Sequence, residues 1–263
     1  MLSNYIETFA LSLIQGVFEF LPISSSAHLL VIAEIFNFNS SSLIIDISLH
    51  LGSLLAITVY FRKDLTKFFQ NKNLALLIVL GSIPLIICGF LLHFSNFIYL
   101  LRNLKIIAWT TLIFGIILFI VDKFKVEKKF DIDLNIKNIL IIGMFQILAL
   151  VPGVSRSGIV ITAGRFLNFD RYDSSKISFY LSIPALTGAS ILSLKDALNQ
   201  NIELNLLIIF SVICSFIISY LTIKYFLIFV KNFSLNIFVF YRIFLALILF
   251  VIVYNKIKTI KYH

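Results

Sequence analysis

The stretches QGVFEFLPISSSAHLL (residues 15–30) and FQILALVPGVSRSGIVIT (residues 145–162) decide the fold of this chain. Each begins as an apolar, helix-like segment, meets a proline, opens into a turn rich in hydroxyl side chains and then becomes apolar again. Glu19, His28 and Arg156 lie inside these stretches. Because an ionisable side chain at membrane depth is costly, its presence there predicts a functional site.

The composition predicts an integral membrane protein. The chain has 263 residues, of which 60% are hydrophobic and 13% are charged, with a mean hydropathy of +1.01. Soluble domains are about 45–50% apolar and about 25% charged. The formal charge of +9 does not indicate nucleic-acid binding, because the basic residues lie in short loops between apolar spans. Cys88 and Cys214 lie within such spans, which indicates buried thiols and no disulfide or cysteine–metal site.

Six segments are long enough, or nearly so, for the roughly 20 apolar residues of a membrane-spanning helix. They are residues 43–61, 74–94, 106–121, 177–194, 204–223 and 237–254. Residues 5–38 and 139–169 are each too long for one helix and too short for two spans with a loop. Each divides at its proline–serine motif, which predicts a re-entrant hairpin whose irregular backbone is buried in protein or lines a wet cavity.

The predicted fold is an all-α, polytopic membrane protein that forms a single membrane domain over residues 1–263. The order is hairpin, three spans, hairpin, three spans, and the two motifs are offset by about 130 residues. With three spans in each half, the second half inserts upside down relative to the first. We therefore predict two inverted repeats, at about 1–121 and 139–263, joined by a cytoplasmic loop at 122–138.

The distribution of Lys and Arg predicts the orientation of the chain. If residues 62–73 are cytoplasmic, 14 of the 22 cationic residues lie on that side, 6 lie outside, and Arg156 and Arg242 lie within the membrane. The excess favours this orientation under the positive-inside rule. The basic tail at 256–261 is the exception, because this topology places it outside.

The first motif carries a carboxylate just before its break. Glu19 is a candidate general base, metal ligand or both, and the alternative is a structural carboxylate that caps the end of the hairpin. Gln15 lies four residues earlier on the same helical face, where it can orient Glu19 or bind a metal through its carbonyl oxygen.

Ser24, Ser25 and Ser26 follow the break and begin a second half-helix. The N-terminus of such a half-helix suits phosphate, although a serine there is also an ordinary N-cap. His28 shares a helical face with Ser25, and a base within reach of a hydroxyl is the usual means of activating it. The pair is a candidate nucleophile and base.

The second motif places Arg156 between Ser155 and Ser157, close to Gly153, which allows close backbone approach. A guanidinium matches phosphate oxygens in a bidentate way. The alternative is an ion pair with a membrane carboxylate such as Glu19, which a ligand would displace.

Other polar residues in the spans are weaker candidates. Arg242, in the last span, snorkels or pairs. His50 and Asp46 lie four apart on one face and are interpreted as a structural polar pair. The chain contains no Walker loop, dinucleotide fingerprint, HExxH or GxSxG pattern.

The two motifs resemble those of the bacterial undecaprenyl-diphosphatase family, also called the bacitracin-resistance proteins. Residues 15–28 match a family pattern close to (E/Q)GxxEFLPxSSxxH, and residues 152–158 match PGxSRSG. The stretch HLGSLLAITVYFRKD (residues 50–64) is also similar to the family's third span.

The resemblance implies hydrolysis of undecaprenyl diphosphate to the monophosphate, which recycles the lipid carrier for peptidoglycan synthesis and gives bacitracin resistance. It implies a multi-pass enzyme of the bacterial plasma membrane, with a site open to the outer face, a divalent cation (Mg²⁺ or Ca²⁺) and a possible homodimer. The catalytic residues it implies are Glu19, Ser25, His28 and Arg156. The substrate-binding residues are Ser24, Ser26, Ser155, Ser157 and Gly153, and the metal ligands are Glu19 and Gln15.

The chain departs from the family pattern at two positions. Gln15 stands where some members have a second glutamate, which bears on any mechanism with two carboxylates on the metal. Val160 stands where a hydroxyl residue commonly follows SRSG, with Thr162 nearby. A phosphoserine intermediate and direct attack by water both stay open. The alternative class is a secondary transporter or flippase for an anionic lipid phosphate, which needs no nucleophile and base.

Overall fold

The computed structural model describes residues 2–25, 27–28, 43–70, 72–93, 101, 103–198 and 206–261. Within these residues every regular element is a helix, and the only β-type pairing is an isolated bridge between Lys128 and Phe169. The predicted all-α class is confirmed. Ser26 and residues 29–42, in the predicted first hairpin, lie outside the described residues.

The helices of the first half are α1 (Leu2–Phe18), α3 (Leu43–Tyr60), α4 (Arg62–Gln70), α5 (Lys72–His93) and α7 (Leu104–Val121). Those of the second half are α8 (Phe130–Asp133), α9 (Ile136–Gln146), the 3₁₀ helix η1 (Ile147–Leu150), α10 (Arg156–Phe166), α11 (Arg171–Leu198), α12 (Leu206–Asn232) and α13 (Asn236–Lys261).

Four of these helices, α5, α7, α12 and α13, are long and apolar enough to cross a membrane. They coincide with four of the six predicted spans. The apolar part of α3, Ile44–Tyr60, is shorter. The remaining predicted span, residues 177–194, lies in α11, which begins with the polar sequence RYDSSK and runs for 28 residues. The chain is therefore a helical membrane protein.

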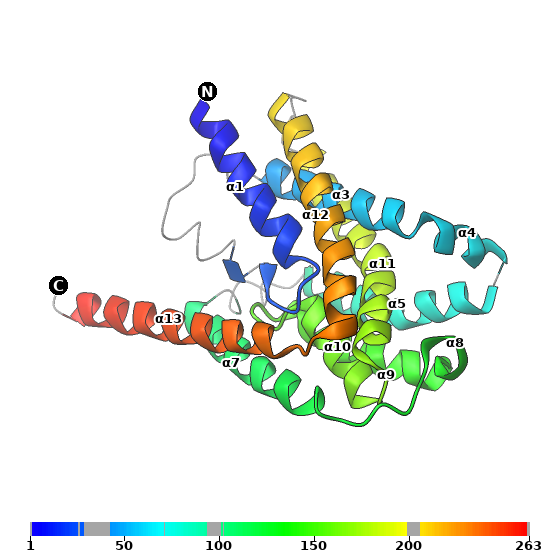
Figure 1. The fold of residues 1–263 in the computed structure, drawn as a ribbon. Helices are drawn as coiled ribbons and strands as arrows, with labels where there is room; N and C mark the ends of the chain where they lie inside the picture. Colours follow the sequence, from blue (N-terminus) through cyan, green and yellow to red (C-terminus); the bar gives the residue numbers. More distant parts are fainter. Residues whose placement is uncertain are drawn as a thin grey trace.

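The helices pack in groups that draw on both halves of the chain. In Figure 1, α1, α3 and α12 lie together, α7 runs along α13, and α5, α9, α10 and α11 form the remainder.

Small side chains allow close contact between α3 and α12. A Cβ added to Gly52 would lie 2.6 Å from the Val212 carbonyl oxygen, and Ser53 Oγ lies 3.2 Å and 3.0 Å from the hydroxyls of Ser215 and Ser219. Small and hydroxyl residues are typical of helix contacts in membranes.

Both motifs interrupt their helices as the sequence predicts. α1 ends at Phe18, shortly before Pro22, and η1 ends at Leu150, before Pro152. A proline has no backbone N–H and disfavours a helical conformation in the residue before it, so neither helix continues through its motif. The chain resumes as α10 at Arg156. The broken stretches thus bring irregular backbone among the helices.

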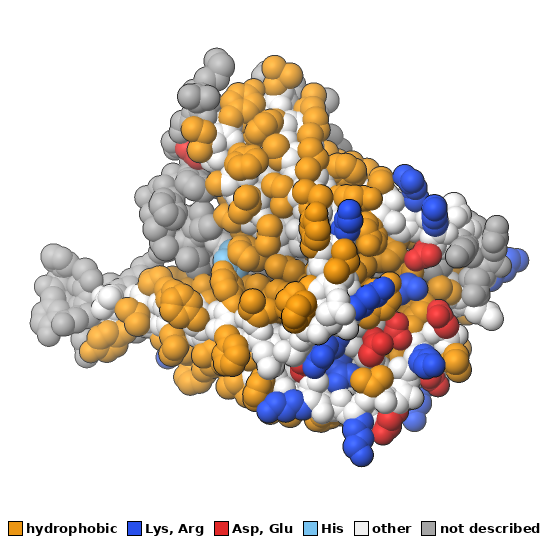
Figure 2. Space-filling model, in the orientation of Figure 1, with side chains coloured by type: hydrophobic (Ala, Val, Ile, Leu, Met, Phe, Trp, Pro, Cys, Tyr) orange, Lys and Arg blue, Asp and Glu red, His pale blue; other side chains and the backbone are white. Residues whose placement is uncertain are grey.

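Charged side chains gather at one end of the molecule. Figure 2 shows Lys, Arg, Asp and Glu clustered over α4, α8 and the connections beside them, whereas hydrophobic side chains dominate the other parts of this face. We call the region of α4, α8 and residues 122–129 and 167–170 the charged end. It contains residues that the positive-inside pattern assigns to one side of the membrane.

Candidate functional site

The Glu19 carboxylate joins the two broken stretches. Its Oε1 lies 2.7 Å from Arg156 Nη2, and its Oε2 accepts a hydrogen bond from Ser25 Oγ at 3.0 Å. The side chains of Arg156 and Glu19 are only 12% and 8% exposed, so the ion pair is largely shielded from solvent. Arg156 Nη1 also donates to the Ser178 carbonyl at 3.2 Å, which fixes the guanidinium on α11. The pairing of Arg156 with Glu19, one of the alternatives from the sequence, is therefore formed.

Gln15 connects Glu19 to a histidine of the next described helix. Its Nε2 lies 3.0 Å from Glu19 Oε2 and 3.0 Å from His50 Nδ1. Because the amide nitrogen donates, His50 Nδ1 accepts, which places the ring proton on Nε2. The sequence indicated a structural pairing of His50 with Asp46; the structure shows in addition that His50 contacts the Glu19 cluster through Gln15. The spacing of residues along the sequence does not predict this contact, because Gln15 and His50 lie on different helices.

His28 and Ser25 have different partners from those predicted. The His28 Nδ1–H donates to the Ser24 carbonyl at 2.6 Å, and His28 Nε2 lies 2.6 Å from the Tyr241 hydroxyl. The imidazole also stacks on Phe18, with ring centroids 4.0 Å apart. Ser25 Oγ, in contrast, donates to Glu19. Ser25 is at the first turn after the break, so its side chain points back toward Glu19. The carboxylate, rather than the imidazole, is positioned to accept the serine proton.

The second motif begins α10 with a capped N-terminus. Ser155 Oγ accepts from the Gly158 N–H at 3.1 Å, and the Ser155 backbone has φ +70°. Ser157 Oγ donates to the Leu21 carbonyl of the first motif at 2.5 Å. Ser24 Oγ accepts from the Ala27 N–H at 3.3 Å, which repeats the capping pattern. The two motifs therefore have the same local hydrogen bonding and touch each other.

Arg242 of α13 holds both motifs through their backbones. Its guanidinium donates to the carbonyls of Pro22 (3.4 Å), Gly153 (3.0 Å), Val154 (3.1 Å) and Thr111 (3.2 Å). The residue is 1% exposed. The sequence indicated that Arg242 snorkels or pairs. It is instead a fully buried cross-link between the turns, which sequence alone could not reveal because all four acceptors are carbonyls.

Gly153 lies against α7. It has φ +90°, and an added Cβ would be 2.2 Å from Thr110 Oγ1. Thr110 Oγ1, on the same helix, also donates a hydrogen bond to the carbonyl of the neighbouring Pro152 at 2.7 Å. Thr162 donates within α10 to the Gly158 carbonyl at 2.7 Å and is buried. Gly153 thus allows the turn to pack closely on α7, and the Thr162 hydroxyl is bonded within its own helix.

The structure brings together five of the ten residues that the sequence selected. Gln15, Glu19, Ser25 and Arg156 form one hydrogen-bonded cluster, with Ser157 on the adjoining turn. The cluster combines a carboxylate, a hydroxyl, a guanidinium and the N-terminus of a helix. Such a set can bind a phosphate group and remove a proton from an attacking oxygen.

The donor atoms of this cluster fit a weakly held divalent cation. Gln15 Oε1 is buried and has no hydrogen-bond partner, beside the Glu19 carboxylate. Within the described part of the chain, no group of three His, Cys, Asp or Glu side chains could hold a metal. Magnesium is commonly held by one or two carboxylates together with substrate phosphates, so one carboxylate and one amide oxygen are a suitable protein contribution.

Comparison with known proteins identifies the family. The family model described as bacitracin resistance protein BacA matches residues 8–248. The chain is 58% identical over 256 residues to the undecaprenyl-diphosphatase of Pelagibacter ubique (strain HTCC1062), covering 97% of this chain and 100% of that protein. It is 43% identical to the undecaprenyl-diphosphatase of Elusimicrobium minutum (strain Pei191), covering 92% and 95%. It is 40% identical to that of Aliivibrio salmonicida (strain LFI1238), covering 92% and 96%. The chain belongs to the bacitracin resistance protein BacA family.

Proposed function

We propose that this protein hydrolyses undecaprenyl diphosphate to undecaprenyl phosphate and inorganic phosphate. The reaction recycles the lipid carrier for peptidoglycan synthesis and confers resistance to bacitracin. The observation that carries this proposal is the position of Glu19, which accepts hydrogen bonds from Arg156 of one broken stretch and Ser25 of the other. The relatives named undecaprenyl-diphosphatase, which match over nearly the whole chain, identify the substrate.

The diphosphate binds where the two stretches meet. Its oxygens replace Glu19 as the partner of the Arg156 guanidinium, which forms bidentate contacts with phosphate. The N-terminus of α10 adds backbone N–H groups and the positive end of the helix dipole. Because Ser178 holds Arg156 from the other side, the guanidinium keeps its position when Glu19 is released.

The chemical step transfers the terminal phosphoryl group to an oxygen nucleophile. The oxygen of water or of Ser25 Oγ forms a bond to the terminal phosphorus while the anhydride P–O bond breaks, and undecaprenyl phosphate leaves. Glu19 accepts the proton of the nucleophile, because its Oε2 already accepts from Ser25. If Ser25 attacks, water then hydrolyses the phosphoserine in a second step. Positioning and charge neutralisation account for most of the catalysis of such transfers.

Glu19 and Gln15 Oε1 are the residues that would hold the divalent cation. When bound, a cation would neutralise charge on the phosphate oxygens. His50 keeps the Gln15 amide in place through its Nδ1. His28, which is fixed by Ser24 and Tyr241, lies beside the first motif and orients the turn that carries Ser25.

We also propose that the fold consists of two inverted repeats, each with a re-entrant hairpin and three membrane helices. The contacts between helices support this, because they occur in matching pairs. α1 packs on α12 and α9 packs on α5, while the corresponding helices α7 and α13 pack on each other, as do α3 and α11. The shared capping of Ser24 and Ser155 gives independent support. Repeats of this kind place binding sites near the middle of the bilayer.

The proposed location is the bacterial plasma membrane, with the charged end in the cytoplasm and the active site open to the outer side. The excess of Lys and Arg on the predicted cytoplasmic loops supports this orientation.

The test is product formation by the purified protein in detergent micelles with C55 isoprenyl diphosphate. Detergent removes the two compartments that transport requires, so release of inorganic phosphate together with undecaprenyl phosphate demonstrates hydrolysis. Magnesium, calcium and a chelator are compared in parallel. Binding of the lipid without phosphate release would contradict the proposal and favour a flippase.

A further inference from the structure

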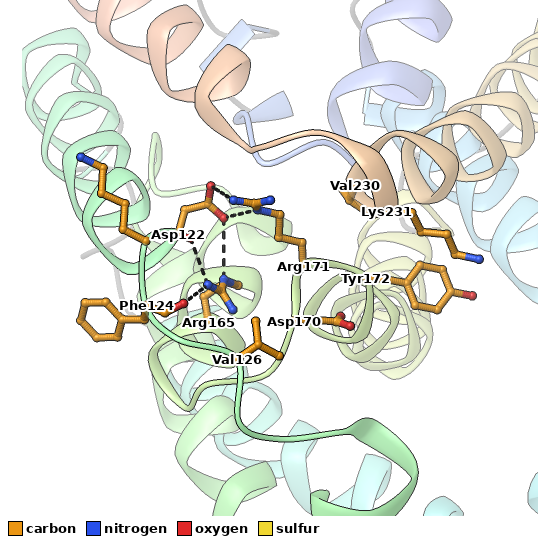
Figure 3. Close-up of a pocket in the computed structure, with 10 residues that line it drawn as sticks. Asp122, Phe124, Val126, Arg165, Asp170, Arg171, Tyr172, Val230 and Lys231 are labelled. Carbon is orange, nitrogen blue, oxygen red and sulfur yellow. Dashed lines mark hydrogen bonds and ion pairs between the residues drawn. The ribbon is translucent and has the colours of Figure 1, made fainter.

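A cavity of about 670 Å³ with several charged lining residues lies at the charged end. It is formed by the end of α7 and the connection after it, the end of α10, the start of α11 and the end of α12 (Figure 3). Its lining residues are Asp122, Lys123, Phe124, Val126, Arg165, Asp170, Arg171, Tyr172, Val230 and Lys231. None of these residues belongs to the Glu19 cluster, and the volume is within the usual range for ligand sites, roughly 300–1,000 Å³.

Two arginines share one carboxylate in this cavity. Arg171 Nε and Nη2 donate to the two oxygens of Asp122 at 2.7 Å and 3.0 Å, and Arg165 Nε lies 3.7 Å from Asp122 Oδ1. Figure 3 shows both guanidiniums directed at Asp122. Asp122 Oδ2 also accepts from the Leu235 N–H at 3.2 Å. The carboxylate is therefore fully engaged and neutralises only one of the two cations.

The other lining residues do not neutralise this positive charge, so cations outnumber carboxylates in the cavity. Asp170 is the other carboxylate, and its Oδ1 accepts from the Asp173 N–H at 2.6 Å as a cap for α11. Lys123 and Lys231 form no ion pair with the described residues. Their ammonium groups lie 3.9 Å from the Phe119 ring centroid and 4.4 Å from that of Tyr172. Four cationic residues and two carboxylates thus line the cavity.

Arg165 is the most constrained of these cations. It is 2% exposed, and its Nη atoms donate to the carbonyls of Phe169, Asp122 and Phe124, while its Nε has no hydrogen-bond partner. Burial lowers the pKa of Arg165, and the charge of Arg171 adds to this against the opposing effect of Asp122 and Asp170. An anion in the cavity would relieve this shortage of negative charge.

We propose that this cavity is an accessory binding site for a phosphate group. Lys231, Lys123 and the 33% exposed side chain of Arg171 would bind the phosphate oxygens. Two sources have this chemistry, the headgroup of an anionic phospholipid and free inorganic phosphate. Basic pockets at the cytoplasmic ends of membrane helices bind anionic lipid headgroups. The exposed side chains of Phe124, Val126 and Phe166 suit the membrane interface beside such a headgroup.

An anion bound here would act on the helix that carries the catalytic arginine. Arg156 is the first residue of α10 and Arg165 the tenth, so they lie about 14 Å apart along the axis at about 1.5 Å per residue. The same anion would connect α10 with α7, α11 and α12. A ligand that binds only the folded state raises the free energy of unfolding of the protein. At ligand concentrations above the dissociation constant, this increase grows with the logarithm of the ligand concentration.

The experiment measures the thermal unfolding midpoint of the purified protein in two series. The first uses nanodiscs of phosphatidylcholine alone or with phosphatidylglycerol. The second uses detergent with inorganic phosphate or with chloride at equal ionic strength. The test variant is Lys123→Gln/Lys231→Gln, which keeps polar side chains at both positions and removes two charges. The matched control is Lys125→Gln/Lys224→Gln, which removes two charges from exposed positions of the same region outside the cavity.

We expect the added anion to raise the midpoint of the wild-type protein and the control equally, and the test variant to lose at least half of this shift. A shift with phosphatidylglycerol alone identifies the lipid headgroup as the ligand. A shift with inorganic phosphate identifies the free anion. The proposal is overturned if neither anion raises the midpoint, or if the test variant and the control respond alike.

Discussion

Arg156 and Glu19 are 137 positions apart in the chain, yet Arg156 Nη2 lies 2.7 Å from Glu19 Oε1. This ion pair joins the two broken stretches in a largely buried position, where an unpaired charge is costly. The contact keeps the guanidinium beside the start of α10, where an anionic substrate gains both the side chain and the helix N-terminus. The resting protein thus contains an internal carboxylate where a phosphate is expected to bind.

Replacement of Arg156 should abolish most of the activity. Arg156→Ala removes the bidentate partner of the diphosphate, and we expect kcat/KM to fall by about 100-fold or more, as for the loss of one strong transition-state contact. Arg156→Lys keeps the charge but lacks the planar fork, so it should recover only part of the loss. Phosphate release measures the effect, and size-exclusion chromatography confirms folding. Wild-type rates in Arg156→Ala would refute the proposed role.

Gln15→Glu should strengthen cation binding. The change places a second carboxylate where Gln15 Nε2 now donates to Glu19 Oε2 at 3.0 Å, and two carboxylates at that distance need a proton or a cation between them. We expect a lower cation concentration for half-maximal activity, and a larger rise in thermal midpoint on addition of Mg²⁺ than in the wild type. An unchanged cation requirement in both measurements would exclude Gln15 from the cation site.

Arg242 should be essential for stability as well as for activity. Arg242→Met leaves the carbonyls of Pro22, Gly153 and Val154 without this donor, and each buried acceptor left unsatisfied costs about 1–3 kcal/mol. We expect a clearly lower thermal midpoint and a loss of phosphate release. Arg62→Gln, at an exposed position, is the control and should change neither. A variant with a normal midpoint would show that the turns do not depend on this cross-link.

Two glycines should respond in opposite ways to alanine. Gly153→Ala adds a Cβ 2.2 Å from Thr110 Oγ1 in a backbone with φ +90°, so the turn must shift. Gly188, within α11, has no atom within 4 Å of an added Cβ, and alanine favours a helix by about 1 kcal/mol over glycine. We expect Gly153→Ala to lower the thermal midpoint and Gly188→Ala to keep or raise it. Equal midpoints would contradict the close approach of this turn to α7.

The sequence predicted the helices and breaks that depend only on neighbouring residues in the chain. Proline at 22 and 152 ends the preceding helices, and long apolar runs become the membrane helices α5, α7, α12 and α13. The importance of Glu19 and Arg156 also followed from local composition, because a charge within an apolar stretch needs a partner. The sequence offered the Arg156–Glu19 ion pair as an alternative to phosphate binding, and the structure shows this pair.

The residues that the sequence missed depend on contacts between distant segments. Arg242 donates only to backbone carbonyls, which every residue has, so no side-chain pattern marks its partners. His50 meets Gln15 only after α1 and α3 pack together. The sequence paired Ser25 with His28 because the two residues share one face of the half-helix after the break. Ser25 lies at the start of that half-helix and its hydroxyl donates to Glu19, whereas His28 is hydrogen-bonded to Tyr241 of α13.

A double-mutant cycle on phosphate release tests most directly whether the two stretches form one diphosphatase site. The rates of the purified wild type, Glu19→Gln, Arg156→Gln and the double variant are compared with C55 isoprenyl diphosphate. Residues that act as a unit are strongly non-additive, so the double variant should lose no more activity than the worse single variant. Losses that multiply in the double variant, or single variants with full activity, would contradict a shared site.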